Sequence, residues 1–141
     1  MALKTRVSQL LPEPGKPRPG NRVELLVNGE QYFPSLLKTI EQARFEIQLE
    51  TYIFADDCLG RAVREALCAA AERGVAVRMV VDGFGAANSV GSHIPVLIKA
   101  GVQVRVFRPK QFFLTPNPKR LRRMHRKVVV IDRDVAFVGG I

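Results

Sequence analysis

The sequence is poor in several residue types, and each shortage narrows what the chain can be. It has no tryptophan and only two cysteines, Cys58 and Cys68, which do not form a CxxC pair. Two reduced thiols are therefore expected rather than a disulfide framework or a cysteine-based zinc site. The chain also has only two histidines, His93 and His125, and they lie at no metal-ligand spacing. No metal site is predicted.

Long hydrophobic runs are missing as well. No apolar stretch reaches the ~18 residues that a membrane-spanning helix needs, and the N-terminus has no signal-peptide core. Apolar residues nevertheless make up 47% of the 141 residues. This length and composition predict one globular domain with a real hydrophobic core.

The most uneven shortage is that of acidic residues. The net charge is +9, and no Asp or Glu occurs between Gly83 and Ile131. The cations of that span are Lys99, Arg105, Arg108, Lys110, Lys119, Arg120, Arg122, Arg123, Arg126 and Lys127. Such a field attracts polyanions, for example anionic lipid, nucleic acid or a phosphodiester substrate. A solvated basic face that serves only solubility is the alternative.

Residues 1–20 read as a disordered or weakly ordered leader, followed by a domain over 21–141. Four prolines break the leader, although its leucines have the spacing of a short interfacial helix. In the domain, alternating and continuous apolar runs predict strands over 23–27, 45–53, 75–81, 102–107, 126–131 and 135–138. Three-and-four spacing predicts a helix over 32–43, an Ala-rich run predicts one over 57–73, and a third is expected over 93–100. Ser92 is expected to cap the last helix, and Gly74 and Gly101 to end the second and third.

Strands that alternate with helices predict the α/β class. We expect a mixed, mostly parallel sheet flanked by helices, with a C-terminal β-hairpin that turns at 132–134. A long loop over 108–124 precedes this hairpin, and loops of that length in compact domains are more often functional than incidental.

A run near the C-terminus bears the chemistry. His125, Lys127, Asp132, Gly139 and Gly140 fit the pattern H-x-K-x4-D-x6-G-G. On a strand, residues two apart project from the same face, which puts an imidazole beside an ammonium. The imidazole can attack phosphorus or act as general acid or base, and the ammonium can neutralise phosphate oxygens. Asp132 would anchor the strand end, and the glycines would allow close backbone approach.

This pattern resembles the signature of the phospholipase D superfamily, the HKD enzymes that cut or transfer phosphodiesters. The resemblance implies a phospholipase D-like repeat whose active site needs two motifs, of which this chain carries one. It implies that His125 is the nucleophile or the acid, Lys127 the phosphate ligand and Asp132 a supporting residue. Substrate binding is assigned to Arg123, Arg126, Gly139 and Gly140. No metal or other cofactor is implied.

Further stretches are similar to the bacterial cardiolipin synthases, especially the short type without transmembrane helices. They are N-G-E-Q-Y-F-P at 28–34, L-E-T-Y-I-F at 49–54, A-A-A-E-R-G-V at 69–75, V-D-G-F-G at 81–85 and R-R-M-H-R-K-V-V-V-I-D at 122–132. The resemblance implies transfer of a phosphatidyl group between phosphatidylglycerol molecules through a phosphohistidine. It also implies a peripheral enzyme of the bacterial inner membrane that binds anionic phospholipid and no nucleic acid. We expect an N-terminal fragment that works as a homodimer or with a missing C-terminal half.

Two other functions stay open at this point. One is a phospholipase D-like nuclease or phosphodiesterase that completes its site by homodimerising; the other is an inactive fragment that binds anionic membranes.

Asp82 and Gly85 are second-tier site candidates, because the loop after the strand predicted over 75–81 lines the site in the family. Glu50 lies on the polar face of its strand, with a solvent or interface position favoured over a site-facing one, and His93 is expected to start a helix without a partner. Phe112 and Phe113 could insert into a bilayer, stack on bases or pack under their own loop.

Overall fold

The computed structural model of the protein describes residues 19–87, 91–109 and 123–139. Nearly all of the expected leader, most of the basic loop with Phe112 and Phe113, and Gly140 lie outside these ranges. Within them the helices are α2 (Asn28–Gln42), α3 (Cys58–Glu72) and α4 (Ile94–Lys99). The strands are β1 (Glu46–Thr51), β2 (Ala76–Asp82), β3 (Gln103–Phe107), β4 (Lys127–Ile131) and β5 (Val135–Val138).

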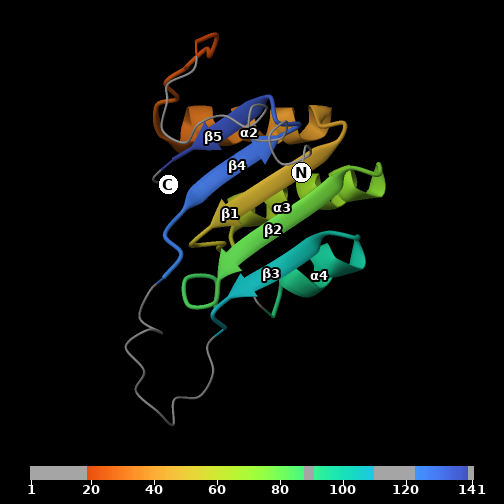
Figure 1. The fold of residues 1–141 in the computed structure, drawn as a ribbon. Coiled ribbons are helices and arrows are strands. Elements are labelled where there is room, and N and C mark those ends of the chain that lie inside the picture. Colours follow the sequence, from red (N-terminus) through yellow and green to blue (C-terminus); the bar gives the residue numbers. More distant parts are fainter. Residues whose placement is uncertain (1–18, 88–90, 110–122, 140–141) are drawn as a thin grey trace, which may run out of the picture.

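The strands form one mixed sheet in the order β3-β2-β1-β4-β5 (Figure 1). β1, β2 and β3 are parallel neighbours, and each strand reaches the next through a helix, as parallel pairing requires. β4 pairs antiparallel with β1, and β5 pairs antiparallel with β4 through the turn at Asp132. The α/β class and the C-terminal hairpin are thus confirmed.

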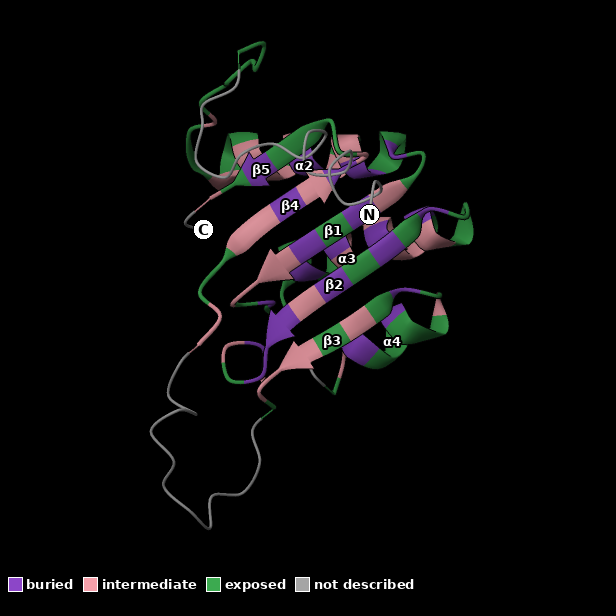
Figure 2. Cartoon of the chain, viewed as in Figure 1, coloured by how far each residue is buried: buried purple, intermediate pink, exposed green. Residues whose placement is uncertain are grey.

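The hydrophobic core lies between the sheet and the three helices, all of which cover the same face (Figure 1). Alternate strand residues point into it, and Figure 2 shows this as a change between buried and exposed residues along β1 and β2. The core strand residues include Ile47, Leu49, Val77, Met79, Val81, Val129, Ile131 and Phe137. On the other face, no helix of the described residues covers the sheet. None of the described helices is both long and apolar enough to cross a bilayer.

Local signals explain where the helices begin and end. Asp57 caps α3, because its side chain accepts a hydrogen bond of 2.7 Å from the Gly60 N–H. Gly74 ends that helix with a φ of +92°, as predicted. α2 begins four residues before the predicted start at Tyr32, since the Gln31 side chain accepts a hydrogen bond from the Val27 N–H at the helix entry.

Two local predictions were wrong. The residues over 23–27 form no strand: Val23, Leu25 and Val27 are 91%, 85% and 55% exposed. Their alternation does favour an extended chain, but a strand also needs a partner with which to exchange hydrogen bonds. Ser92 does not cap α4; His93 occupies the N-cap position, without a side-chain capping bond.

Candidate active site

His125 and Lys127 lie at the edge of the sheet where the parallel strands end. β4 runs antiparallel to β1, so its first residue, Lys127, pairs with the last residue of β1, Thr51. β2 also ends at this edge, with Asp82. In open α/β sheets, ligands bind outside the carboxyl ends of the strands. This edge is therefore where the topology favours a site.

The His125 imidazole is exposed and lies against the ring of Tyr52. His125 precedes β4 and is not part of the strand, so strand geometry alone does not fix its direction. Its ring centroid is 4.9 Å from that of Tyr52, with an interplanar angle of 50°. A Cβ at Gly85 would lie 2.3 Å from the Tyr52 carbonyl oxygen and 3.0 Å from its ring. The glycine thus allows Tyr52 to reach the position where it contacts His125.

Asp82 fixes the backbone that leads into His125. The residue is fully buried, and its carboxylate accepts three backbone hydrogen bonds. Oδ1 accepts from Phe84 at 2.9 Å and from Gly85 at 3.3 Å. Oδ2 accepts from the N–H of Met124, the residue before His125, at 3.0 Å. One buried side chain therefore joins the turn after β2 to the segment that holds the imidazole.

Among the described residues, Lys127 has no carboxylate partner for its charge. Its side chain is partly buried, and within the described residues no carboxylate lies at ion-pair distance from its ammonium. The Gly139 N–H donates a 3.1 Å hydrogen bond to the Lys127 carbonyl, so Gly139 lies beside the site while Gly140 is outside the described residues. An ammonium that the described residues leave without a carboxylate partner, two residues from an exposed imidazole, is suited to bind an anion that the imidazole attacks.

The two arginines predicted to bind substrate have partners within the protein. Arg123 lies over the Phe84 ring at 4.9 Å, and its Nη1 atom is 3.9 Å from Asp82 Oδ1. Arg126 donates a 3.0 Å hydrogen bond to the Glu50 side chain. Glu50 projects from one face of the sheet, whereas its strand neighbours Leu49 and Thr51 project from the other face and line a cavity there. The structure therefore gives Glu50 an ion-pair role and directs Arg126 away from the face that Lys127 shares with Thr51.

Asp132 lies at the far end of β4 and does not meet the other motif side chains. At ~3.3 Å per residue, five steps along a strand separate it from Lys127 by roughly 16 Å. Its carboxylate accepts hydrogen bonds of 2.8, 2.8 and 2.9 Å from the N–H groups of Arg44, Phe45 and Glu46. The bond from Glu46, with those from Arg44 and Phe45, holds the pKa of Asp132 below its ordinary value. Asp132 thus anchors the start of β1 to the hairpin.

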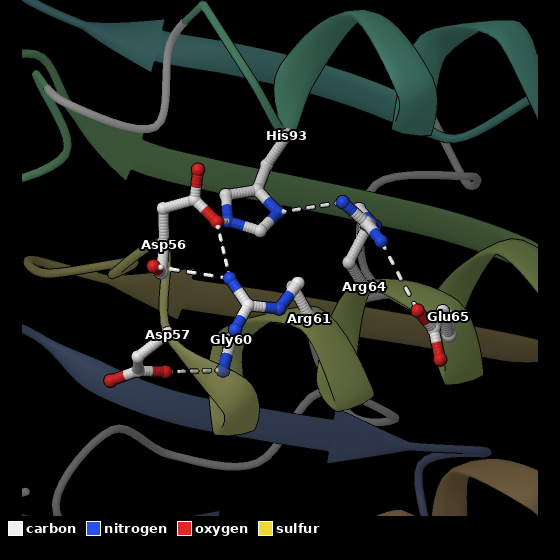
Figure 3. Close-up of polar contacts among 7 residues, drawn as sticks. All are labelled: Asp56, Asp57, Gly60, Arg61, Arg64, Glu65 and His93. Atoms are coloured by element: carbon white, nitrogen blue, oxygen red, sulfur yellow. Dashed lines mark hydrogen bonds and ion pairs between the residues drawn. The ribbon is translucent and has the colours of Figure 1, made fainter.

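The second histidine, His93, is fully buried and has partners that the sequence did not suggest. Its Nε2 atom lies 3.2 Å from Asp56 Oδ1, and its Nδ1 atom lies 3.5 Å from Arg64 Nη1 (Figure 3). The Phe54 ring packs against it edge-on at 5.1 Å. This cluster joins the loop after β1 to the start of α4, and that loop begins with Tyr52. A fully buried imidazole cannot meet a substrate, so its role here is structural.

The sequence thus singled out His125 and Lys127 as candidates, but not all of the residues that hold them in place. Tyr52 was missed, although it lies within L-E-T-Y-I-F at 49–54, and only its place after a strand marked it. Asp82 and Gly85 were second-tier candidates, and the structure brings both to the site. Within the described ranges, no group of three or more His, Cys, Asp or Glu is arranged to hold a metal ion.

The sequence matches the family described as "Cardiolipin synthase, PLD-like domain" over residues 36–141. Among curated proteins, cardiolipin synthase B of Escherichia coli strain K12 is 42% identical over 124 residues. A probable cardiolipin synthase of Bacillus subtilis strain 168 is 35% identical over 121 residues. These alignments cover 88% and 86% of the present chain but only 30% and 24% of the relatives. The chain therefore spans less than a third of the length of these relatives.

Solved structures show the same fold. NucT from Helicobacter pylori has a TM-score of 0.60 and 25% identity, over 76% of this chain and 64% of its own. A phospholipase D family member, Nuc from Salmonella typhimurium, has a TM-score of 0.57 and 24% identity, over 80% and 66%. The likeness supports the mixed sheet with helices described above.

Proposed function

Because the chain belongs to the cardiolipin synthase family of phospholipase D-like domains, we propose that it forms one half of a phosphatidyltransferase site. In this function a phosphatidyl group of phosphatidylglycerol passes to His125 and then to a glycerol hydroxyl of a second phosphatidylglycerol. The product is cardiolipin, and the enzyme works as a peripheral protein on the bacterial inner membrane. The observation that supports this proposal best is the exposed imidazole of His125 two residues from the Lys127 ammonium, which has no carboxylate partner among the described residues.

The chemistry divides into two displacements at phosphorus. A ring nitrogen of His125 attacks, the P–N bond forms, and the P–O bond to the departing glycerol breaks. A hydroxyl of the acceptor lipid then attacks phosphorus, passes its proton to the group that protonated the departing glycerol, and displaces the imidazole. Lys127 stabilises the charge on the non-bridging oxygens, which grows in both transition states. Tyr52 and Asp82 keep the imidazole in place, so the attack loses little to misorientation.

The departing glycerol needs a proton, and the described residues of this chain offer no second histidine for that purpose, because His93 is buried. We propose that the acid comes from a second motif, either in a further domain of a longer chain or in a second copy of this one. The family resemblance supports this arrangement, in which two motifs share one active site.

The proposal is tested by trapping the covalent intermediate. The chain is mixed with phosphatidylglycerol vesicles, quenched at alkaline pH and weighed by intact-mass spectrometry, and the lipids are analysed for cardiolipin. We expect a phosphatidyl adduct that is absent from His125→Ala, reduced in Lys127→Met and unchanged in Lys99→Met, which removes an exposed lysine on α4.

Three other results would contradict the proposal. Vesicle binding without adduct or cardiolipin would overturn completion of the site by a second copy and would make the 141-residue chain alone a binder of anionic surfaces. Cleavage of single-stranded DNA that rises with protein concentration, without lipid transfer, would favour a dimeric nuclease. An adduct that persists in His125→Ala would place the chemistry on another residue.

A further inference from the structure

A second feature of the same edge is an apolar cavity that the phosphate chemistry does not use. It has a volume of about 270 Å³ and lies between β1, β4 and the helices α2 and α3. Its inner wall is made of the buried side chains Leu36, Leu49, Phe54, Val63 and Val129. An enclosed apolar cavity of roughly 150 Å³ can already hold a benzene molecule. The volume is thus large enough for a short hydrocarbon segment.

The cavity opens beside the reacting pair. Lys127 is one of its lining residues, and so is Thr51, with which Lys127 is paired. Ile53, the neighbour of the tyrosine that contacts His125, also lines it and is 56% exposed. Leu59, at the start of α3, is 41% exposed. One end of the cavity is therefore cationic and adjoins the phosphate position, and apolar side chains form its open rim.

The few polar groups of the cavity leave it apolar inside. The Asp57 carboxylate already accepts the capping bond from Gly60. The Thr51 hydroxyl donates a 2.7 Å hydrogen bond to the Ile53 carbonyl, and Glu50 pairs with Arg126. The Lys127 ammonium is thus the lining charge without a partner among the described residues. A ligand that complements this cavity has an anionic head and an apolar tail.

We propose that the cavity binds the first part of one acyl chain of the phospholipid whose phosphate lies at Lys127. This inference rests on the proposed function and adds to it how the lipid is recognised. The anionic head stays at the mouth near His125, and the chain enters between α2 and α3. Chain and headgroup together then place phosphorus beside the imidazole, and a headgroup without a chain binds more weakly.

The test measures affinity as a function of chain length. Glycerophosphoglycerol, which has no acyl chain, and single-chain phosphatidylglycerols of increasing length are titrated calorimetrically into the 141-residue chain, each below its micelle-forming concentration. Burial of one CH₂ group predicts up to a fourfold gain in affinity, and about two- to fourfold per CH₂ is expected until the cavity is full. Beyond that length the affinity levels off.

Matched surface variants keep the test independent of folding. Ile53→Glu puts a carboxylate at the rim, and Ile98→Glu makes the same change at an equally exposed position, 56%, on α4 away from the cavity. We expect Ile53→Glu to abolish the gain with chain length and to leave the weak binding of glycerophosphoglycerol within about threefold. Ile98→Glu should keep both the gain with chain length and the binding of glycerophosphoglycerol, and Leu59→Glu should have the same effect as Ile53→Glu.

The possible failures are distinguishable. If glycerophosphoglycerol binds but longer chains bind no tighter, the cavity proposal is wrong and the phosphate site stands. If no compound binds, the proposed function fails as well. If Ile53→Glu turns a dimer into a monomer in sedimentation experiments and chain length has no effect, the cavity is a contact with a second copy and the lipid proposal is overturned.

Discussion

Replacing Asp82 by asparagine removes one acceptor from a buried cluster of three donors. The amide can turn its oxygen toward the N–H groups of Phe84 and Gly85, but its NH₂ group then faces the N–H of Met124. The Met124 N–H then faces another N–H donor instead of a carboxylate oxygen, and its hydrogen bond is lost. The segment before His125 thereby loses its tie to the turn after β2.

The cost follows from the number and type of bonds lost. A hydrogen bond to a charged acceptor contributes about 1.5–3 kcal/mol, and Asp82 is fully buried, so water does not replace it. We expect Asp82→Asn to lower the free energy of unfolding by about that amount. With a urea m-value of ~2 kcal/mol/M, the unfolding midpoint falls by about 1 M. A displacement of the imidazole by ~1 Å would slow adduct formation by up to about a hundredfold in protein that is still folded.

The control is Asp134→Asn, the same chemical change at an exposed position in the hairpin turn. Both variants are unfolded in urea and followed by circular dichroism, and the rate of the His125 adduct is measured where each remains fully folded. Equal midpoints for the two variants would show that Asp82 does not hold the loop. A lower midpoint with an unchanged adduct rate would show that it stabilises the fold without positioning His125.

Three further predictions concern the supports of the site. Tyr52→Ala should slow adduct formation about two- to tenfold, since an aromatic pair contributes ~0.5–1.5 kcal/mol. Tyr52→Phe keeps the ring and should leave the rate unchanged. Equal rates for the two variants would show that the ring contact does not position His125. Gly85→Ala should lower the free energy of unfolding by about 1–3 kcal/mol in calorimetry, because the alanine methyl group would meet the Tyr52 backbone. An unchanged melting temperature would contradict that close approach. The pKa of Asp132 is lower in the folded state than its ordinary value of 3.8. The Asp132 carboxylate therefore stabilises the fold above pH 3.8, and this contribution is lost as the pH falls through the folded-state pKa. The wild type should therefore unfold at a higher urea concentration than Asp132→Asn near neutral pH, and this difference should vanish in acid. A difference that does not depend on pH would refute the stabilising role of the carboxylate.

The regular elements could be predicted because they depend on short-range patterns. Apolar spacing located the five observed strands and the three helices to within a few residues, and glycines marked two helix ends. The exception is informative. Val23, Leu25 and Val27 alternate like a strand, but pairing depends on a partner elsewhere, and local pattern holds no information about that partner.

The candidate reacting groups could be proposed from the sequence, but the contacts that hold them in place could not. His125 and Lys127 stand out because their types and spacing suit phosphate chemistry. Asp82 is 42 residues from Met124 in sequence, and only the folded sheet brings the two together. Asp132 was expected to anchor the strand end, and its carboxylate binds backbone N–H groups there, at the opposite end of β4 from Lys127. Residues of one sequence motif therefore need not lie in one site.

The most direct test of the central claim uses the fact that the chain has only two histidines. The claim is that His125 and Lys127 together bind a phosphodiester. Glycerophosphoglycerol is titrated while the imidazole proton resonances are followed by NMR, with buried His93 as an internal reference. We predict a saturable shift of the His125 resonance alone, lost in Lys127→Met and kept in Lys99→Met. A His125 resonance that does not respond, or one that responds equally in Lys127→Met, would contradict the claim.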